Sequence, residues 1–241
     1  MVFASYLREK GDQFRQEHLN SNDISDRTQM PAQFPSWPNG TAWMRTPWPS
    51  APALGGPFLG VHWRCGDYVS DTQYNTYTNT ASPFLAAKQI SEALRRHGLN
   101  TVFLATDATD YEIKILEEEL APYNVVRFTP SRSDWLLLGP GGLAIVDQWI
   151  CAHARVFIGT SPSTFTFRIT EERTIMGFSP ESTFNTLCPD GTTKYYTSNV
   201  QQEAKNTKAC EALTFWPIKL ESGFILSEEN ADSESSTRDE L

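Results

Sequence analysis

The sequence predicts an α/β fold: a parallel, doubly wound sheet of the Rossmann type with helices on both faces. Short apolar segments alternate with amphipathic segments from residue 58 onward, and Gly, Pro or Ser stand at many of their boundaries. Regular alternation of strand and helix is typical of parallel sheets. Because ligands bind beyond the carboxyl ends of such strands, the side chains that directly follow each predicted strand are the candidates for function.

The predicted elements follow one another in the order that such a sheet requires. Ser82 and Pro83 have the properties of an N-cap and a first helical residue. Gly98 and Gly177 end two helices, since glycine readily adopts the left-handed conformation that closes a helix. The expected strands are residues 58–63, 101–106, 125–128 and 155–159, and the expected helices are residues 2–19, 82–98, 110–121, 141–154 and 164–176.

The composition divides the chain into four predicted parts. Residues 1–30 hold a leading amphipathic helix. Residues 31–57 hold seven prolines and three tryptophans and form a linker, in which Asn39 is a glycosylation acceptor if the chain enters the secretory pathway. Residues 58–220 form the ligand-binding domain, and residues 221–241 form an acidic tail predicted to be disordered.

The charge and the hydropathy argue against two classes of partner. The formal net charge is -9, without a basic stripe, so no nucleic-acid partner is expected. No apolar run reaches the roughly 18 residues of a membrane span, so no span is expected. Residues 1–19 are charged and amphipathic, which is unlike a signal peptide.

The last four residues, 238–241, are Arg-Asp-Glu-Leu. They differ by one residue from the retention signal Lys-Asp-Glu-Leu, which a receptor recognises. The alternative is an acidic tail that ends this way by chance. The signal predicts the lumen of the endoplasmic reticulum and a retention receptor as partner. Because retention requires entry, we expect an upstream signal peptide outside this sequence.

The four cysteines fit a secretory compartment. Cys188 and Cys210 flank a polar segment, and a disulfide between them would stabilise the fold by roughly 3 kcal/mol through loop closure. Cys151 lies in an apolar helical run and is expected to be a buried thiol.

Two clusters follow predicted strands. The first, residues 62–67, is His-Trp-Arg-Cys-Gly-Asp. The planar fork of Arg64 suits phosphate oxygens, while Asp67 could orient Arg64 or accept from a sugar hydroxyl; the alternative is a common surface ion pair. The second, residues 159–165, brings small residues and hydroxyls to a helix N-terminus. It predicts an anion site, with a plain helix cap as the alternative.

A third candidate is Asp147, which lies within an otherwise apolar helical run. A buried carboxylate needs hydrogen-bond donors, and one edge of guanine offers two. The alternative is a structural cap to a nearby loop. The sequence has no Asp-x-Asp motif, so the prediction is a site without a metal, in which Arg64 and the helix N-terminus act in place of a cation.

Longer motifs carry a resemblance to a known family. They are residues 141–155 (Gly-Gly-Leu-Ala-Ile-Val-Asp-Gln-Trp-Ile-Cys-Ala-His-Ala-Arg), 157–165 (Phe-Ile-Gly-Thr-Ser-Pro-Ser-Thr-Phe), 54–64 and 102–108. These motifs, and the paired cysteines, resemble the protein O-fucosyltransferase 2 family. The resemblance implies an inverting transfer of fucose from GDP-fucose to Ser or Thr of folded thrombospondin type 1 repeats. It also implies that this chain is the C-terminal, donor-binding domain of a GT-B glycosyltransferase.

The resemblance also implies roles for individual residues, without a cofactor or metal. Arg64 would bind the β-phosphate and stabilise the departing GDP, and Asp147 would recognise guanine. The other residues of the donor site would be His62, Asp67, Ser163, Thr164 and Phe165.

Two departures from the family pattern stand out. The family motif has a second arginine where this chain has Cys65, which weakens the local positive field. The family's general base is a glutamate of the N-terminal domain, which we expect to lie outside this chain. The alternative function is therefore a GDP-sugar-binding module without transfer activity.

Overall fold

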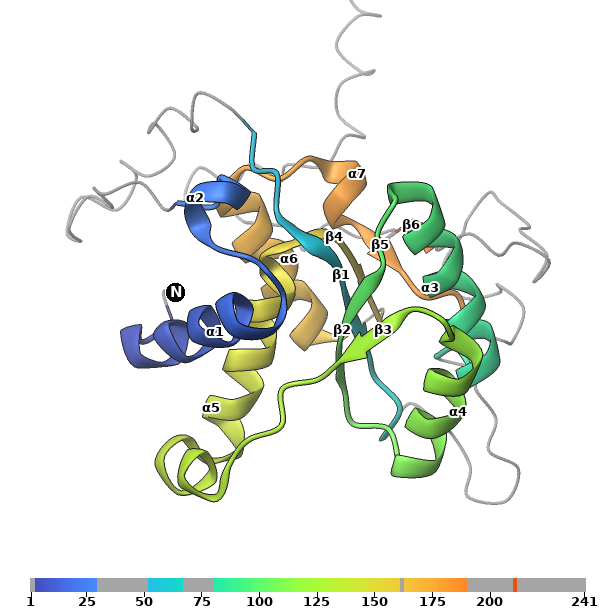
Figure 1. The fold of residues 1–241 in the computed structure, drawn as a ribbon, viewed down its shortest axis with the longest axis horizontal. Coiled ribbons are helices and arrows are strands. Elements are labelled where there is room, and N and C mark those ends of the chain that lie inside the picture. The colour runs from blue at the N-terminus through green and yellow to red at the C-terminus, as the bar shows by residue number, and fades with distance from the viewer. Residues whose placement is uncertain (1–2, 30–51, 67–79, 161–162, 190–209, 212–241) are drawn as a thin grey trace, which may run out of the picture. The chain divides into compact units, whose positions relative to one another are not determined.

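The computed structural model describes residues 3–29, 52–66, 80–160, 163–189 and 210–211. These residues form one sheet with the strand order β3-β2-β1-β4-β5-β6 (Figure 1). The strands are β1 (Gly56–Trp63), β2 (Thr101–Thr106), β3 (Asn124–Val126), β4 (Ala154–Gly159), β5 (Asn185–Thr186) and β6 (Cys210–Glu211). The helices are α1 (Ser5–His18), α2 (Asp23–Asp26), α3 (Pro83–His97), α4 (Asp110–Leu120), α5 (Arg132–Ala152), α6 (Thr164–Met176) and α7 (Pro180–Thr183).

The strand order places a topological switch point between β1 and β4. The first five strands pair in parallel, and only the short β6 is antiparallel to its neighbour β5. The chain moves outward from β1 through β2 to β3 and then returns to place β4 on the other side of β1. The connections that leave β1 and β4 therefore diverge. A ligand site is expected at their carboxyl ends.

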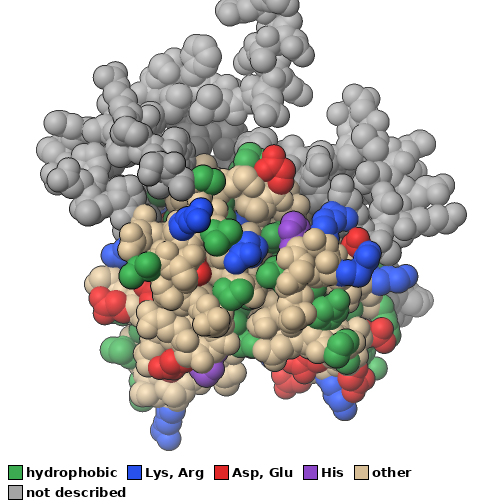
Figure 2. All heavy atoms as spheres, turned by 45° about the horizontal axis from the view of Figure 1, so that its top comes forward, with side chains coloured by type: hydrophobic (Ala, Val, Ile, Leu, Met, Phe, Trp, Pro, Cys, Tyr) green, Lys and Arg blue, Asp and Glu red, His purple; other side chains and the backbone are tan. Residues whose placement is uncertain are grey.

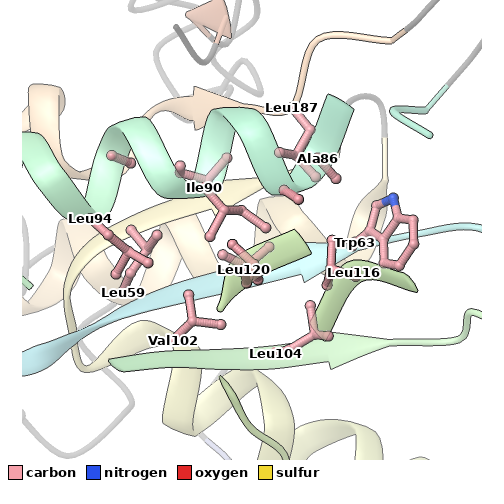
Figure 3. Packing of buried hydrophobic residues seen from close by; sticks show 14 of the residues in the cluster. Leu59, Trp63, Ala86, Ile90, Leu94, Val102, Leu104, Leu116, Leu120 and Leu187 are labelled. Carbon is pink, nitrogen blue, oxygen red and sulfur yellow. The ribbon is translucent and has the colours of Figure 1, made fainter. Parts of the chain in front are cut away.

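Each face of the sheet is covered by its own helices, because side chains alternate between the faces along a strand. One face packs against α3 and α4, and we call this cluster the α3/α4 core (Figure 3). The other face packs against α1, α5 and α6, and we call this cluster the α5/α6 core. Leu59, Val61 and Trp63 point into the α3/α4 core, whereas Phe58 points into the α5/α6 core.

The α/β class and the parallel sheet predicted from the sequence are confirmed. The predicted caps are also present: Ser82 accepts a hydrogen bond from the backbone of Leu85, and Gly98 and Gly177 close their helices in the left-handed conformation. The short elements α2, α7, β5 and β6 were not predicted. With two to four residues each, they have too little hydrophobic periodicity to be recognised.

Helix α5 is longer than predicted because a second helical segment precedes it. Gly139 has φ 62° and ψ 176°, so a kink separates residues 132–138 from the predicted segment. Ser131 and Asp134 form a capping box at the start. Gly139 and Pro140 are residue types that interrupt helices, and here the helix resumes directly after the kink.

The membrane prediction needs one correction. By length and composition, Arg132–Ala152 is long and apolar enough to cross a membrane. Gly139 interrupts this segment, and its second part supplies Val146, Ile150 and Cys151 to the α5/α6 core. Length and composition do not distinguish such a core helix from a membrane span.

The leading helix packs on the α5/α6 side. Leu7 belongs to that core, and Gly11 lies so close to Trp149 that a Cβ at this position would be 2.7 Å from the indole ring. Helix α1 and the α5/α6 core belong to one compact unit, Met1–Glu211. The linker residues 30–51 and the tail residues 212–241 lie outside the described residues. On the face seen in Figure 2, positive and negative side chains are interspersed.

Candidate functional site

Thr160 joins the ends of β1 and β4, the two strands at the switch point of the sheet. Its hydroxyl donates to the carbonyl of His62 (2.8 Å) and accepts from the backbone N–H of Arg64 (3.0 Å). Its own N–H donates to the hydroxyl of Thr166 on α6 (3.0 Å). The end of β1, the end of β4 and the first turn of α6 are thereby held as one piece.

His62 is buried beneath this junction. Its Nδ1 lies 2.7 Å from Oγ1 of Thr166, and its ring stacks on Phe165 with centroids 4.3 Å apart. Burial, and secondarily the charge of Arg64, lowers the pKa of His62 to about 3. The imidazole is therefore neutral at any physiological pH and supports Phe165 without carrying a charge.

Arg64 extends from the end of β1 to the neighbouring strand end. Its Nη1 lies 2.9 Å from Oδ2 of Asp107, which directly follows β2, and 38% of its side chain is exposed. The other carboxylate oxygen of Asp107 accepts from the backbone N–H of Cys65 (2.7 Å). The contact with Asp107 thus fixes the position of the guanidinium at the carboxyl edge of the sheet.

The N-terminus of α6 lies beside this junction. Ser163 is the N-cap, but its hydroxyl makes no capping hydrogen bond to the helix. Its carbonyl accepts from the N–H of Phe167, while Thr164 is exposed. The first N–H groups of a helix lack partners inside the helix and attract anions. Phosphate oxygens are the ligands that this turn suits best.

Asp147 lies on α5, close to the same turn. The neighbouring side chain of Gln148 donates to the carbonyl of Phe165 at 3.5 Å. Burial raises the pKa of Asp147 to about 7, partly offset by the charge of Arg127. Among the described residues, no hydrogen bond or ion pair to the Asp147 carboxylate is found. A half-buried carboxylate of this kind gains from an incoming pair of N–H donors.

The structure therefore brings His62, Arg64 and the first turn of α6 together. Gln148, the residue after Asp147 on α5, connects α5 to that turn. Asp67 and Asn39 lie outside the described residues. These site assignments stay predictions, as does the role of each residue toward a ligand.

Sequence reasoning included Thr160 in the 159–165 cluster but missed two other side chains that hold this site. Thr166 accepts from Thr160, and Asp107 holds Arg64. Asp107 lies before α4, whose N-cap is Thr109. The rule that selected Arg64 would also have selected Asp107, since both directly follow a strand.

The cysteines differ in state. Cys188 is disulfide-bonded, whereas Cys65 and Cys151 are free and buried. The predicted buried thiol at Cys151 is confirmed. The side chain of Cys210 lies outside the described residues, so its pairing with Cys188 stays a prediction. The backbone of Cys210 lies opposite Thr186 in the ladder between β5 and β6.

One group of side chains in the described ranges has the spacing of metal ligands. Asp12, Asp23 and His153 offer ligand atoms within 4.8 Å of one another. The guanidinium of Arg15 lies 2.7 Å from Asp12 and 3.0 Å from Asp23. The Arg15 guanidinium therefore already occupies the position that a metal ion would take between these carboxylates. The group lies at the amino edge of the sheet, opposite the candidate site.

A shallow hollow of about 230 Å³ lies on the outer side of α3 and α4, lined among others by Lys88, Arg95 and Tyr123. None of the candidate site residues lines it. It is not considered part of the site.

The comparisons with known proteins identify the family of the chain. The model of the GDP-fucose protein O-fucosyltransferase family matches residues 1–176. A human GDP-fucose protein O-fucosyltransferase 2 is 43% identical over 218 residues, and one from Drosophila melanogaster is 38% identical over 233 residues. The chain belongs to the GDP-fucose protein O-fucosyltransferase family, a family of transferases.

The alignments cover most of this chain but less than half of the relatives. They include 90% of the chain and 44% of the human relative, and 96% of the chain and 42% of the Drosophila relative. A crystal structure of POFUT1 in complex with GDP-fucose matches with a TM-score of 0.44 and 18% identity, over 79% of this chain and 47% of that one. The chain therefore spans a little under half the length of these relatives.

Proposed function

We propose that this chain binds GDP-fucose and supplies the donor side of fucose transfer to Ser or Thr of folded thrombospondin type 1 repeats. The family and the names of its relatives support the donor. The observation that carries the proposal is the junction between the ends of β1 and β4. There Thr160 accepts from the backbone N–H of Arg64 and donates to the hydroxyl of Thr166, so Arg64 and the first turn of α6 follow two adjacent, connected strand ends.

The diphosphate would bind between Arg64 and the α6 turn. Arg64 would contact the β-phosphate, and Ser163, Thr164 and Phe165 would contribute hydroxyls and backbone N–H groups. Negative charge grows on GDP as the bond to fucose breaks, and fixed donors that meet this charge lower the barrier. In this proposal no metal ion is needed, since the guanidinium and the helix N-terminus neutralise the phosphates.

Guanine would be recognised by Asp147. An ionised carboxylate accepts both N–H groups of one guanine edge, and these donors would replace the water that burial removes from Asp147. Its raised pKa is a consequence of that burial. His62 would stay neutral and support Phe165 from below, and Asp67 would line the same pocket.

The remaining parts of the proposal concern the whole protein. The donor domain would be the C-terminal, doubly wound half of a GT-B enzyme, and the general base of an inverting displacement would come from the other half. The terminal residues 238–241 support residence in the lumen of the endoplasmic reticulum through a retention receptor. A disulfide between Cys188 and Cys210 and glycosylation at Asn39 fit that compartment.

Calorimetric titration of the full chain with GDP tests the donor site. Arg64→Ala is expected to weaken GDP binding by at least about tenfold, because a charge-assisted contact to phosphate contributes about 1.5–3 kcal/mol. Arg96→Ala is the matched control: it removes an arginine of α3 that pairs with Glu92 away from the site, and GDP affinity should not change. Equal GDP affinity in the Arg64 variant and the unmodified chain contradicts the assignment.

A second function is the alternative that the sequence left open. It is a GDP-sugar-binding module that holds the donor without transferring fucose. Incubation of the chain with GDP-fucose and a folded thrombospondin repeat separates the two functions. Fucosylated repeat indicates a complete transferase, while GDP binding without product indicates the binding module.

A further inference from the structure

The carboxylate of Asp107 joins two parts of the turn that follows β1. Oδ1 accepts from the backbone N–H of Cys65 at 2.7 Å, and Oδ2 pairs with Nη1 of Arg64 at 2.9 Å. We propose that Asp107 is a positioning residue, which holds the Arg64 guanidinium in the orientation that receives the diphosphate. This inference rests on the proposed function of the donor site.

The register of the sheet explains why these residues meet. β1 and β2 are parallel, and Trp63 lies opposite Thr106 in the last pair of the ladder. The hydroxyl of Thr106 donates to the carbonyl of Trp63 at 2.6 Å, which ties the two strand ends together. Arg64 and Asp107 are the next residues on each strand. Their contact is therefore fixed by two paired strands.

Gly66 leaves room for the Asp107 carboxylate. A Cβ at this position would lie 2.5 Å from Oδ2 of Asp107, which is closer than atoms can approach. Any larger residue at position 66 would push the end of the Asp107 side chain away from Arg64. The glycine thus provides the space in which the carboxylate bridges backbone and guanidinium.

Two opposing effects on phosphate binding follow from this arrangement. A carboxylate near the diphosphate repels it, whereas a guanidinium already held in place loses less side-chain freedom on binding. Arginine has five N–H donors in a planar fork, a geometry that suits phosphate oxygens. Oδ1 already accepts a backbone N–H, which reduces the negative field at this carboxylate. We therefore expect positioning to outweigh repulsion.

Asp107→Asn tests the inference in the full chain. Asparagine keeps the size and the oxygen that accepts from Cys65 but loses the ion pair. GDP affinity should fall about three- to tenfold, in the range of one lost charged contact, while guanosine affinity stays unchanged. A loss through general misfolding would weaken both ligands equally. Asp110→Asn, at the exposed start of α4, is the matched control and should leave both affinities unchanged.

Asp107→Asn in an Arg64→Ala background shows whether Asp107 affects GDP binding through Arg64 or directly. If Asp107 works by holding Arg64, Asp107→Asn should change GDP affinity by less than twofold in that background. Gly66→Ala provides a second route, because it displaces the carboxylate without removing it. It should also weaken GDP selectively over guanosine.

Three results overturn the inference. They are unchanged or tighter GDP binding by Asp107→Asn, an equal loss of GDP and guanosine affinity, or a full effect of Asp107→Asn without Arg64. None of these results bears on GDP binding by the unmodified chain, which tests the donor site itself. A chain that binds no GDP before any substitution overturns the proposed function and this inference together.

Discussion

Arginines stand at both edges of the parallel sheet, but their surroundings differ. At the carboxyl edge, Arg64 is 38% exposed and contacts Asp107, which is itself partly exposed. At the amino edge, Arg15 and Arg173 are fully buried, with 1% and 0% of their area accessible. One edge thus keeps an arginine within reach of a ligand, and the other encloses two in the protein.

Arg173 is surrounded by backbone oxygens. It donates to the carbonyls of Ala152, Ala154 and Ser182, and its guanidinium lies 3.8 Å from the ring centroid of Phe178. These contacts join the end of α6 to the start of β4 and to α7. The N–H donors of Arg173 are therefore used in hydrogen bonds within the protein.

Arg15 is surrounded by carboxylates. It contacts Asp12, Asp23 and Asp26 at 2.7, 3.0 and 3.3 Å, and its Nε donates to Ser21. The contacts connect α1 to α2, which is labelled at the upper left of Figure 1. A buried charge is tolerated only with such partners. The comparison teaches that the exposure of the guanidinium, more than the residue type, distinguishes a structural arginine from one placed for a ligand.

The largest effect is expected at Arg173. Arg173→Met keeps the length of the side chain but leaves several backbone carbonyls without donors. The free energy of unfolding should fall by about 3–5 kcal/mol, since each buried acceptor left unsatisfied costs about 1–3 kcal/mol. Urea denaturation followed by circular dichroism measures it. Arg95→Met, on an arginine whose side chain is 72% exposed, is the control and should have little effect. A loss below about 1 kcal/mol at Arg173 would remove the distinction between the two edges.

Arg15→Met should have the next largest effect, and the effect should depend on pH. Three carboxylates lose their cation, which costs about 2–4 kcal/mol at pH 7. Burial already raises the pKa of Asp12, and loss of Arg15 raises it further. The folded variant then binds more protons than the unfolded chain, so its stability rises as pH falls. The deficit measured at pH 7 should shrink at pH 5. A deficit that is constant across this range contradicts the charge argument.

Asp147 allows a test of the carboxyl edge itself. With its pKa raised to about 7 by burial, the carboxyl is largely protonated at pH 6 and cannot accept both guanine donors. Affinity for guanosine should fall about tenfold per pH unit below that pKa. Guanosine is used as the ligand in place of GDP, because a phosphate group also titrates near pH 6. Asp147→Asn should bind guanosine weakly and with a flat profile from pH 5.5 to 8. Equal pH profiles of the two chains would exclude Asp147 as the guanine ligand.

The two edges also differ in how far the sequence predicts them. Arg64 and the α6 turn could be found because each directly follows a strand with clear hydrophobic periodicity, and both rules are local. The same rule reaches Asp107 and Thr160, but their contacts could not be assigned, because their partners lie on neighbouring strands more than 40 residues away. The network of Arg15 depends on α2, a helix of four residues without a periodic pattern. Local patterns therefore predict elements and exposed strand ends, while enclosed partners require the packed structure.

The smallest effect is expected at Cys65, which replaces an arginine of the family motif. The replacement suggested a weaker positive field at the donor site, but the thiol is 1% exposed and lies in the α3/α4 core with Trp63. Its backbone N–H, which donates to Asp107, does not depend on the side chain. Cys65→Ala should lower the free energy of unfolding by about 1 kcal/mol, through a small cavity. GDP affinity should change by less than twofold in calorimetry. A change of fivefold or more would mean that position 65 acts on the phosphates, and that the open edge extends to the α3/α4 side of the sheet.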